Sequence, residues 1–118
     1  MVINWKAIII GFFISLIVGI LISFIPIIGG FISTFGAAII VGYIAKGSLE
    51  NGALNGAIMG FLSRFIESII IIFTGYTFIN EINPIIASIG ILLIVILFVI
   101  HIIIAAIGGA IGSLLSAS

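Results

Sequence analysis

Three ionisable side chains stand inside long apolar stretches of this chain: Arg64 and Glu67 in one, and His101 in another. A charge inside hydrocarbon is costly, so such residues face protein or water and are functional candidates by default. Arg64 and Glu67 are three residues apart, which places them one helical turn apart and within reach of an ion pair.

Two interpretations of these residues are open. In the first, Glu67 or His101 relays a proton or a cation, while Arg64 tunes the Glu67 carboxylate or receives an anion. In the second, Arg64 and Glu67 form a structural ion pair, and His101 is hydrogen-bonded to a carbonyl or a serine. The spacing of the residues fits both.

Residues for other chemistry are missing from the sequence. The 118 residues include no cysteine and one histidine, so thiolate sites and histidine clusters are excluded. There is no phosphate-binding loop, dinucleotide fingerprint, paired-carboxylate metal site or serine nucleophile with a base in register. We therefore expect no enzymatic activity, no cofactor and no metal. The formal net charge of zero gives no basic field, so we also expect no nucleic-acid partner.

The composition is that of an integral membrane protein, whose first partner is the lipid bilayer. Hydrophobic residues make up 64% of the chain, charged residues 5%, and the mean hydropathy is +1.71. In soluble domains, about a quarter of the residues are charged. The first apolar run exceeds the roughly 7 to 15 residues of a secretory signal core, so we expect it to be retained.

Breaks in the apolar pattern divide the chain into four helices within one domain, 1–118. Pro26 and the Gly29-Gly30 pair form the first break. The hydrophilic segment 46–51 forms the second, with Gly47 as a left-handed C-cap and Ser48 as an N-cap. We expect helices at about 5–25, 27–46, 49–73 and 84–115.

The expected fold is therefore an all-α membrane protein with four transmembrane helices in two antiparallel hairpins. Segment 74–83 is expected to be an exposed loop, and Asn83-Pro84 to start the last helix. That helix is about 45 Å long, which exceeds a bilayer core of about 30 Å. Whether the Pro26 turn crosses the bilayer fully or is re-entrant stays open.

Small residues recur at helical spacing on each expected helix, and they let helix backbones approach closely in lipid. The predicted packing residues are Gly11, Ser15, Gly19, Ser23, Ala38, Gly42, Gly52, Gly56, Gly60, Ala105, Gly108 and Gly112. His101 lies on the same helical face as Ala105, Gly108 and Gly112. Packing within a monomer and packing between subunits are both open, and the number of stripes favours self-association or contact with other membrane subunits.

The third helix is not expected to insert stably into the bilayer without other protein contacts. Eleven Ile, Leu and Phe residues between Leu54 and Phe73 contribute roughly 3 to 7 kcal/mol to insertion. Arg64 and Glu67 each cost roughly 2.5 to 3.5 kcal/mol. Neighbouring helices or an Arg64–Glu67 pair must therefore shelter the charges. Lys6 and Lys46 flank one side of a four-crossing topology, which predicts cytoplasmic amino and carboxyl termini.

Several short segments carry a resemblance to a known family. They are Asn4-Trp5-Lys6-Ala7 before a glycine-spaced helix, Gly42-Tyr43-Ile44 before a polar loop, and Asn51-Gly52-Ala53 followed by Gly56-Ala57. In these the chain resembles a family of small archaeal four-helix membrane proteins of unknown function. The resemblance implies the four-helix architecture and an archaeal membrane location, and it implies no activity.

The sequence thus leads to two function hypotheses of different classes. The first is a non-enzymatic membrane protein with a structural or accessory role, acting as a homo-oligomer or as a small subunit of a membrane complex. The rival is a small channel or transporter for an ion, a proton or a small solute, with Arg64, Glu67 and His101 as its polar track.

Overall fold

The computed structural model describes residues 2–22, 24–25, 28–79 and 84–117. Its regular structure consists of four helices, α1 (Trp5–Leu21), α2 (Ile28–Ala45), α3 (Leu49–Ile79) and α4 (Pro84–Ala117). The described residues thus confirm an all-helical chain of four helices. The predictions for Ser23, Pro26, Glu81 and Asn83 fall outside the described residues.

α1 begins where the sequence predicts and ends early. The Asn4 side chain accepts a hydrogen bond of 3.1 Å from the Ala7 N–H, which caps the first turn. The predicted end near residue 25 is wrong, because the helix stops at Leu21. A proline at position 26 has no N–H for the Ile22 carbonyl, and its ring would clash with that carbonyl in a continued helix. The Ile25 N–H donates to the Ile22 carbonyl instead.

The junction between α2 and α3 follows the predicted caps with one difference. Gly47 is left-handed, with φ of 82°, but Lys46 before it is left-handed as well, with φ of 59°. The Ser48 hydroxyl accepts a 3.2 Å hydrogen bond from the Asn51 N–H, as expected of an N-cap. Ser113 of α4 donates to the Gly47 and Ser48 carbonyls, which fixes this loop against the end of α4.

α3 is longer than predicted. The loop expected over 74–83 is wrong for its first part, since the helix continues to Ile79. Aromatic and polar residues suggested the loop, but segment 74–79 contains one glycine and no proline. Its backbone is therefore free to continue the helical hydrogen bonds.

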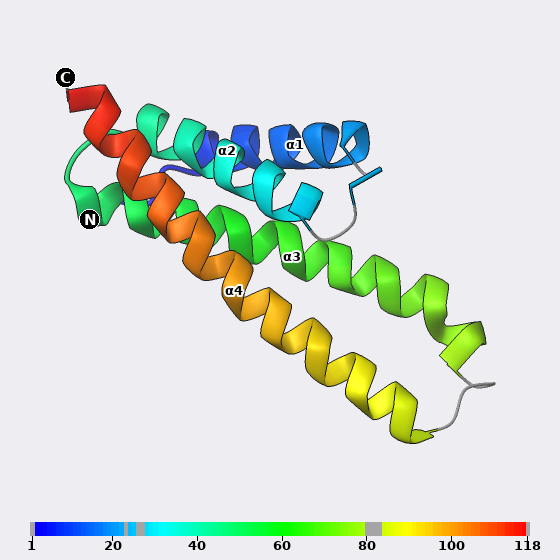
Figure 1. Cartoon of the computed structure of the whole chain (residues 1–118). Helices are drawn as coiled ribbons and strands as arrows, with labels where there is room; N and C mark the ends of the chain where they lie inside the picture. Colours follow the sequence, from blue (N-terminus) through cyan, green and yellow to red (C-terminus); the bar gives the residue numbers. More distant parts are fainter. Residues whose placement is uncertain (1, 23, 26–27, 80–83, 118) are drawn as a thin grey trace.

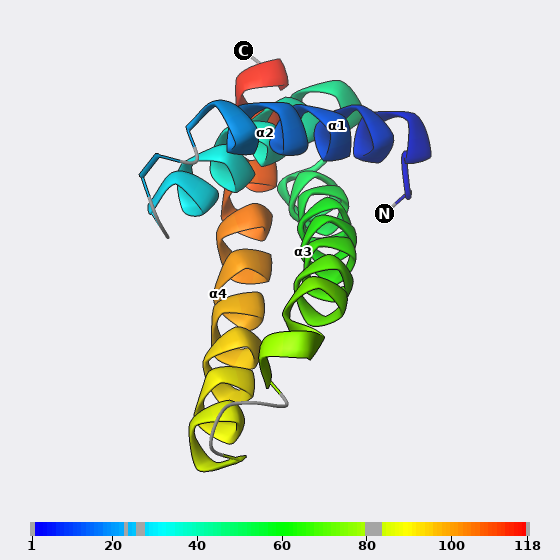
Figure 2. The ribbon, with the colours of Figure 1, turned by 90° about the vertical axis from the view of Figure 1, so that its right-hand side faces the viewer.

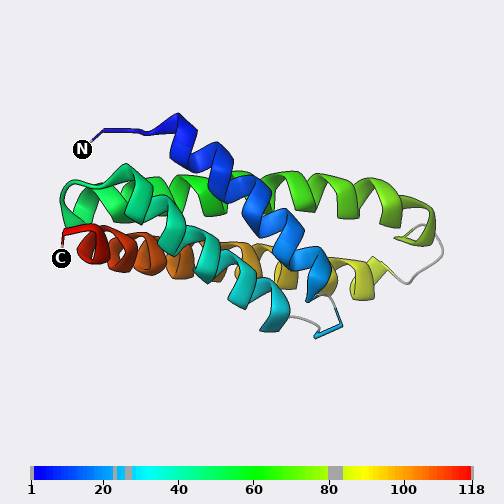
Figure 3. The same cartoon turned by 90° about the horizontal axis from the view of Figure 1, so that it is seen from above.

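The helices form an asymmetric arrangement with extents of 53 × 26 × 21 Å. α3 and α4 lie side by side along their length, and α1 and α2 lie side by side across one end of that pair (Figures 1 and 2). Seen from above, α1 and α2 cross the longer pair obliquely (Figure 3). The carboxyl-terminal part of α3 and the amino-terminal part of α4 project past them (Figure 1). We call these segments, 69–79 and 84–96, the extension.

Among the side chains that the structure describes, the buried apolar ones lie where the four helices meet. Among the described residues this core consists of Ala7, Ile8, Ala37, Ala38, Val41, Met59 and Ala105. Most of these side chains are small, so the helices are close together in this part.

Within the described ranges, three helices contain segments that are long and apolar enough to cross a membrane, namely Ile28–Ala45, Leu49–Ile70 and Ser88–Ala117. α1 is apolar but has 17 residues, or about 26 Å, against a bilayer core of about 30 Å. The element lengths and the composition are those of a membrane protein.

Candidate functional site: a polar centre between the helices

Arg64 and Glu67 form an ion pair at the middle of α3. The distance between Arg64 Nη1 and Glu67 Oε2 is 2.6 Å, across one helical turn. The two side chains retain 21% and 31% of their accessible surface. Because the Glu67 carboxylate neutralises the Arg64 guanidinium, the free-energy cost of placing either charge in this apolar helix is reduced.

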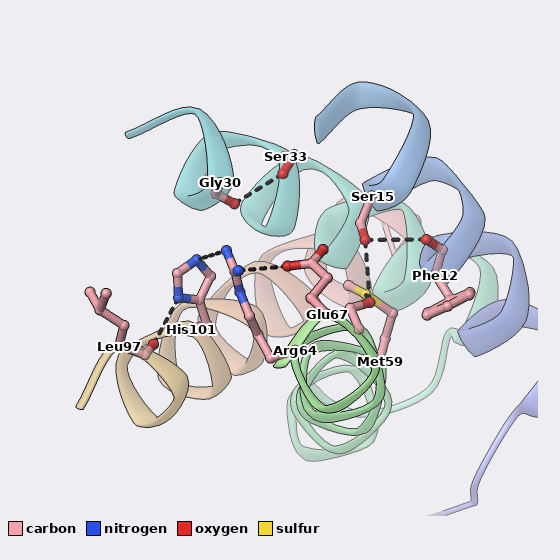
Figure 4. Close-up of polar contacts among 10 residues, drawn as sticks. Phe12, Ser15, Gly30, Ser33, Met59, Arg64, Glu67, Leu97 and His101 are labelled. Atoms are coloured by element: carbon pink, nitrogen blue, oxygen red, sulfur yellow. Dashed lines mark hydrogen bonds and ion pairs between the residues drawn. The ribbon is translucent and has the colours of Figure 1, made fainter. Parts of the chain in front are cut away.

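The same guanidinium reaches α4. Arg64 Nη2 lies 2.5 Å from His101 Nε2, and His101 Nδ1 lies 2.7 Å from the Leu97 carbonyl oxygen (Figure 4). A guanidinium and a carbonyl have fixed roles as donor and acceptor. Nδ1 therefore carries the proton and Nε2 accepts from Arg64, so the geometry describes a neutral imidazole. We call Arg64, Glu67 and His101 the polar centre.

α2 completes the surroundings of the polar centre. The Phe31 ring stacks on the His101 ring, with centroids 4.2 Å apart and planes at 18°. Gly30 lies next to the guanidinium, because a Cβ atom there would be 2.6 Å from Arg64 Nη2. A side chain at position 30 would displace Arg64, so this glycine makes room for the charge.

Hydroxyl groups from the other helices lie near the polar centre. The Ser15 hydroxyl of α1 is 3.2 Å from the Ser63 hydroxyl of α3, and Ser33 of α2 donates to the Gly30 carbonyl (Figure 4). Each of these serines is buried. In the described part of the chain, every buried side-chain nitrogen or oxygen has a hydrogen-bond partner.

The structure brings together the three ionisable residues that the sequence singled out. Sequence reasoning did not identify Gly30 and Phe31 as their neighbours, because Gly30 was interpreted as part of a turn. The sequence signal that could have identified these neighbours is an aromatic residue next to a glycine at the start of a helix. In the described residues, no three side chains of the metal-ligating types come together.

The predicted packing residues lie mostly at contacts between helices of the same chain. A Cβ atom on Gly42, Gly52 or Gly56 would overlap the backbone of Gly109 or Ala105 in α4. On α4, Gly108 faces the Ala38 side chain of α2, Gly112 faces the Ile39 and Tyr43 backbone of α2, and Ala105 lies against Gly60 of α3. On α1, Gly11 lies against Val41 and Met59.

Two positions differ from this pattern. Gly19 has room for a methyl group, since the nearest atom to a Cβ there is the Ser33 hydroxyl at 3.6 Å. Gly109, which was not among the predicted packing residues, lies against Gly42 of α2 and against Gly52 and Gly56 of α3. The four-residue spacing of Ala105, Gly109 and Ser113 was the signal for it.

The sequence profile of a family of unknown function, DUF5518, matches residues 5–115. The chain belongs to this family. The match extends over α1 to α4, so the resemblance expected from the sequence to a family of unknown function is confirmed. Membership in DUF5518 assigns no activity to the polar centre. No curated protein and no solved structure matches the chain.

Proposed function

We propose that this DUF5518 protein is a non-enzymatic membrane protein with a structural or accessory role, acting as a homo-oligomer or as a small subunit of a membrane complex. The observation that carries the proposal is the engagement of both ring nitrogens of His101, one with Arg64 and one with the Leu97 carbonyl. A relay residue must take up and release its proton or ion. His101 would have to break an existing bond to do either.

In this proposal the polar centre is an internal clamp. Arg64 bonds within α3 and to α4, and Phe31 of α2 covers His101. These contacts hold α2, α3 and α4 in register. A polar network whose buried groups are hydrogen-bonded favours one arrangement of the helices.

Small residues then hold the helices together around this clamp. The close approaches of Gly42, Gly52 and Gly56 to α4 support this part of the proposal. Most of the described glycines in these stripes contact helices of the same chain, so the argument for self-association rests on another surface.

The extension is the surface we assign to assembly. Its α3 and α4 segments project away from α1 and α2 (Figures 1 and 2). An apolar groove of about 340 Å³ begins there, lined by Ser68 and by α4 residues that include Ile91, Val95 and Phe98. A second copy is the simplest occupant, because a two-fold contact needs one self-complementary face.

The test is the stoichiometry of the full-length protein released from lipid nanodiscs, measured by native mass spectrometry. Val95 and Ile17 are similarly exposed, at 54% and 58%, but lie on the extension and on the outer face of α1. We expect Val95→Trp to shift assemblies towards the monomer and Ile17→Trp to leave them unchanged. A wild-type chain that is monomeric and without bound partners would contradict the proposal.

A second candidate function is a small channel or transporter. Its favouring observation is that Arg64 and Glu67 keep part of their surface exposed, beside serine hydroxyls from three helices. Flux into liposomes that contain the wild-type chain, the Glu67→Gln variant or the Arg64→Ala variant separates the two functions. Movement of an ion or solute that both variants abolish would favour transport over a structural role.

A further inference from the structure

Two asparagine side chains are buried at the start of α3, away from the polar centre. Asn55 is fully buried and Asn51 is 8% exposed, and they lie four residues apart on one face of the helix. A buried amide is costly unless its oxygen and nitrogen are hydrogen-bonded. The partners of these two amides therefore indicate what this part of the protein binds.

The partners are backbone atoms of the segment before α1. The Val2 N–H donates to Asn51 Oδ1 at 2.7 Å, and Asn55 Nδ2 donates to the Val2 carbonyl at 3.0 Å. Two residues later, the Asn4 N–H donates to Asn55 Oδ1 at 2.6 Å. Bonds to alternate residues of an extended chain are what a neighbouring β-strand would offer.

The side chains of the bound segment contribute little to this contact. Val2 and Ile3 are exposed, at 73% and 45% of their surface. The two asparagines therefore recognise an extended backbone with free N–H groups at alternate positions, and the identity of the side chains matters less.

The asparagines are held in place independently of the segment they bind. Asn51 Nδ2 also donates to the Lys46 carbonyl at 2.7 Å, and Asn55 Nδ2 donates to the Asn51 carbonyl at 2.8 Å. A groove of about 360 Å³ beside them is lined by Val2, Ala45, Gly47, Ser48 and Asn51. Each asparagine side chain thus also makes a hydrogen bond that does not involve the segment.

Among the described residues, α1 contacts two of the other three helices. It contacts α2 and α3 but not α4. Its Gly11 lies over Val41 and Met59, and its Ser15 hydroxyl meets Ser63, so α1 covers the line where α2 and α3 meet. Ser63 is one turn from Glu67 on the same helix.

We propose that Asn51 and Asn55 form a docking site for an extended polypeptide segment, that residues 2–4 of the same chain occupy it, and that this occupancy keeps α1 closed over Ser63. Release of the segment lets α1 move away from α3 and exposes the buried side of α3 next to the polar centre. The inference is independent of self-association.

The occupant is tested by cross-linking in the full chain, which has no natural cysteine. Val2 and Ala45 line the same groove and neither is a docking asparagine. A short bismaleimide should join the Val2→Cys, Ala45→Cys variant within one chain. A cross-link between two chains, or none, would overturn the assignment of residues 2–4 as the occupant.

The effect on α1 is tested by the reactivity of the Ser63→Cys variant in membranes with a small membrane-permeant maleimide. Adding Asn55→Ala should raise the labelling rate at least tenfold, since the bonds to Val2 and Asn4 are lost. Ser113→Ala is the matched control, because it removes bonds to the Gly47 and Ser48 carbonyls at the same end of the molecule.

We expect the control to stay within twofold of the parent. Equal rates in the Asn55→Ala and Ser113→Ala backgrounds would show that the asparagine does not control α1. Asn55→Asp keeps the side chain's size and its acceptor oxygen but loses the donor to Val2, so it should give an intermediate rate. If Asn55→Ala does not fold, an Asn55→Asp rate equal to that of the parent would overturn the proposal.

Discussion

Arg64 shows how one side chain can be acceptable in an apolar helix. Its two terminal nitrogens bond to Glu67 and to His101, and Gly30 leaves the space that the guanidinium occupies. The hydrogen bonds to Glu67 and His101 thus offset the free-energy cost of placing a guanidinium in an apolar helix. The ion pair was predictable from a three-residue spacing, whereas the histidine contact depends on how α3 and α4 align.

Removing the positive charge tests this account at the residue scale. Arg64→Met keeps the aliphatic stem but leaves the Glu67 carboxylate unpaired. We expect a loss of about 2 kcal/mol in the free energy of unfolding, below the range of about 3 to 5 for fully buried pairs because both side chains are partly exposed. Thermal unfolding in mild detergent measures it.

The double variant Arg64→Met, Glu67→Gln is the control for that experiment. It removes both charges, so it should recover part of the lost stability. If the double variant loses as much free energy of unfolding as Arg64→Met alone and Glu67→Gln alone together, the ion pair contributes no coupling energy.

Gly42 and Gly36 allow a matched test of close packing within α2. A methyl group at position 42 would overlap the Gly109 carbonyl, while one at position 36 would meet nothing within 4 Å. Gly42→Ala should lower the free energy of unfolding by about 2 kcal/mol, because backbone atoms cannot turn aside. Gly36→Ala should raise it by up to about 1 kcal/mol through helix propensity. Equal effects of the two changes would argue against backbone contact at Gly42.

At the scale of the elements, the sequence predicted the helices better than their ends. Ser48 and Pro84 were correct starts because capping and proline chemistry are local. The end of α1 was misplaced because a proline affects the turn before it, and the end of α3 because polarity alone does not break a helix. The obliqueness of α1 and α2 has no local signal, since it results from packing among four helices.

The N-cap of α1 gives a prediction for one element. Asn4→Ala removes the acceptor for the Ala7 N–H but keeps the Asn4 backbone bond to Asn55. The free energy of unfolding should fall by about 1 kcal/mol. Asn4→Asp retains an acceptor and should cost less in the same thermal unfolding measurement. Equal losses would mean that capping does not stabilise α1.

At the scale of the molecule, the central feature is the difference between its two ends. One end has four helices, a core of small side chains and a polar centre at its inner limit. The other end consists of α3 and α4, and the exposed side chains that the structure describes there are mostly Ile, Leu, Val and Phe. Composition predicted a membrane protein and spacing predicted small-residue faces. Neither composition nor spacing indicated that α1 and α2 would leave the extension uncovered. How far α1 and α2 extend along α3 and α4 depends on where the helices cross.

Cross-linking from single cysteines in native membranes tests this account most directly. Val95→Cys places a thiol on the extension, and Ile17→Cys places one with similar exposure on α1. We predict that Val95→Cys forms disulfide-linked dimers, or cross-links to one other membrane chain, while Ile17→Cys remains a monomer. Equal cross-linking at the two positions, or none at Val95→Cys, would contradict the account of the extension as the assembly surface.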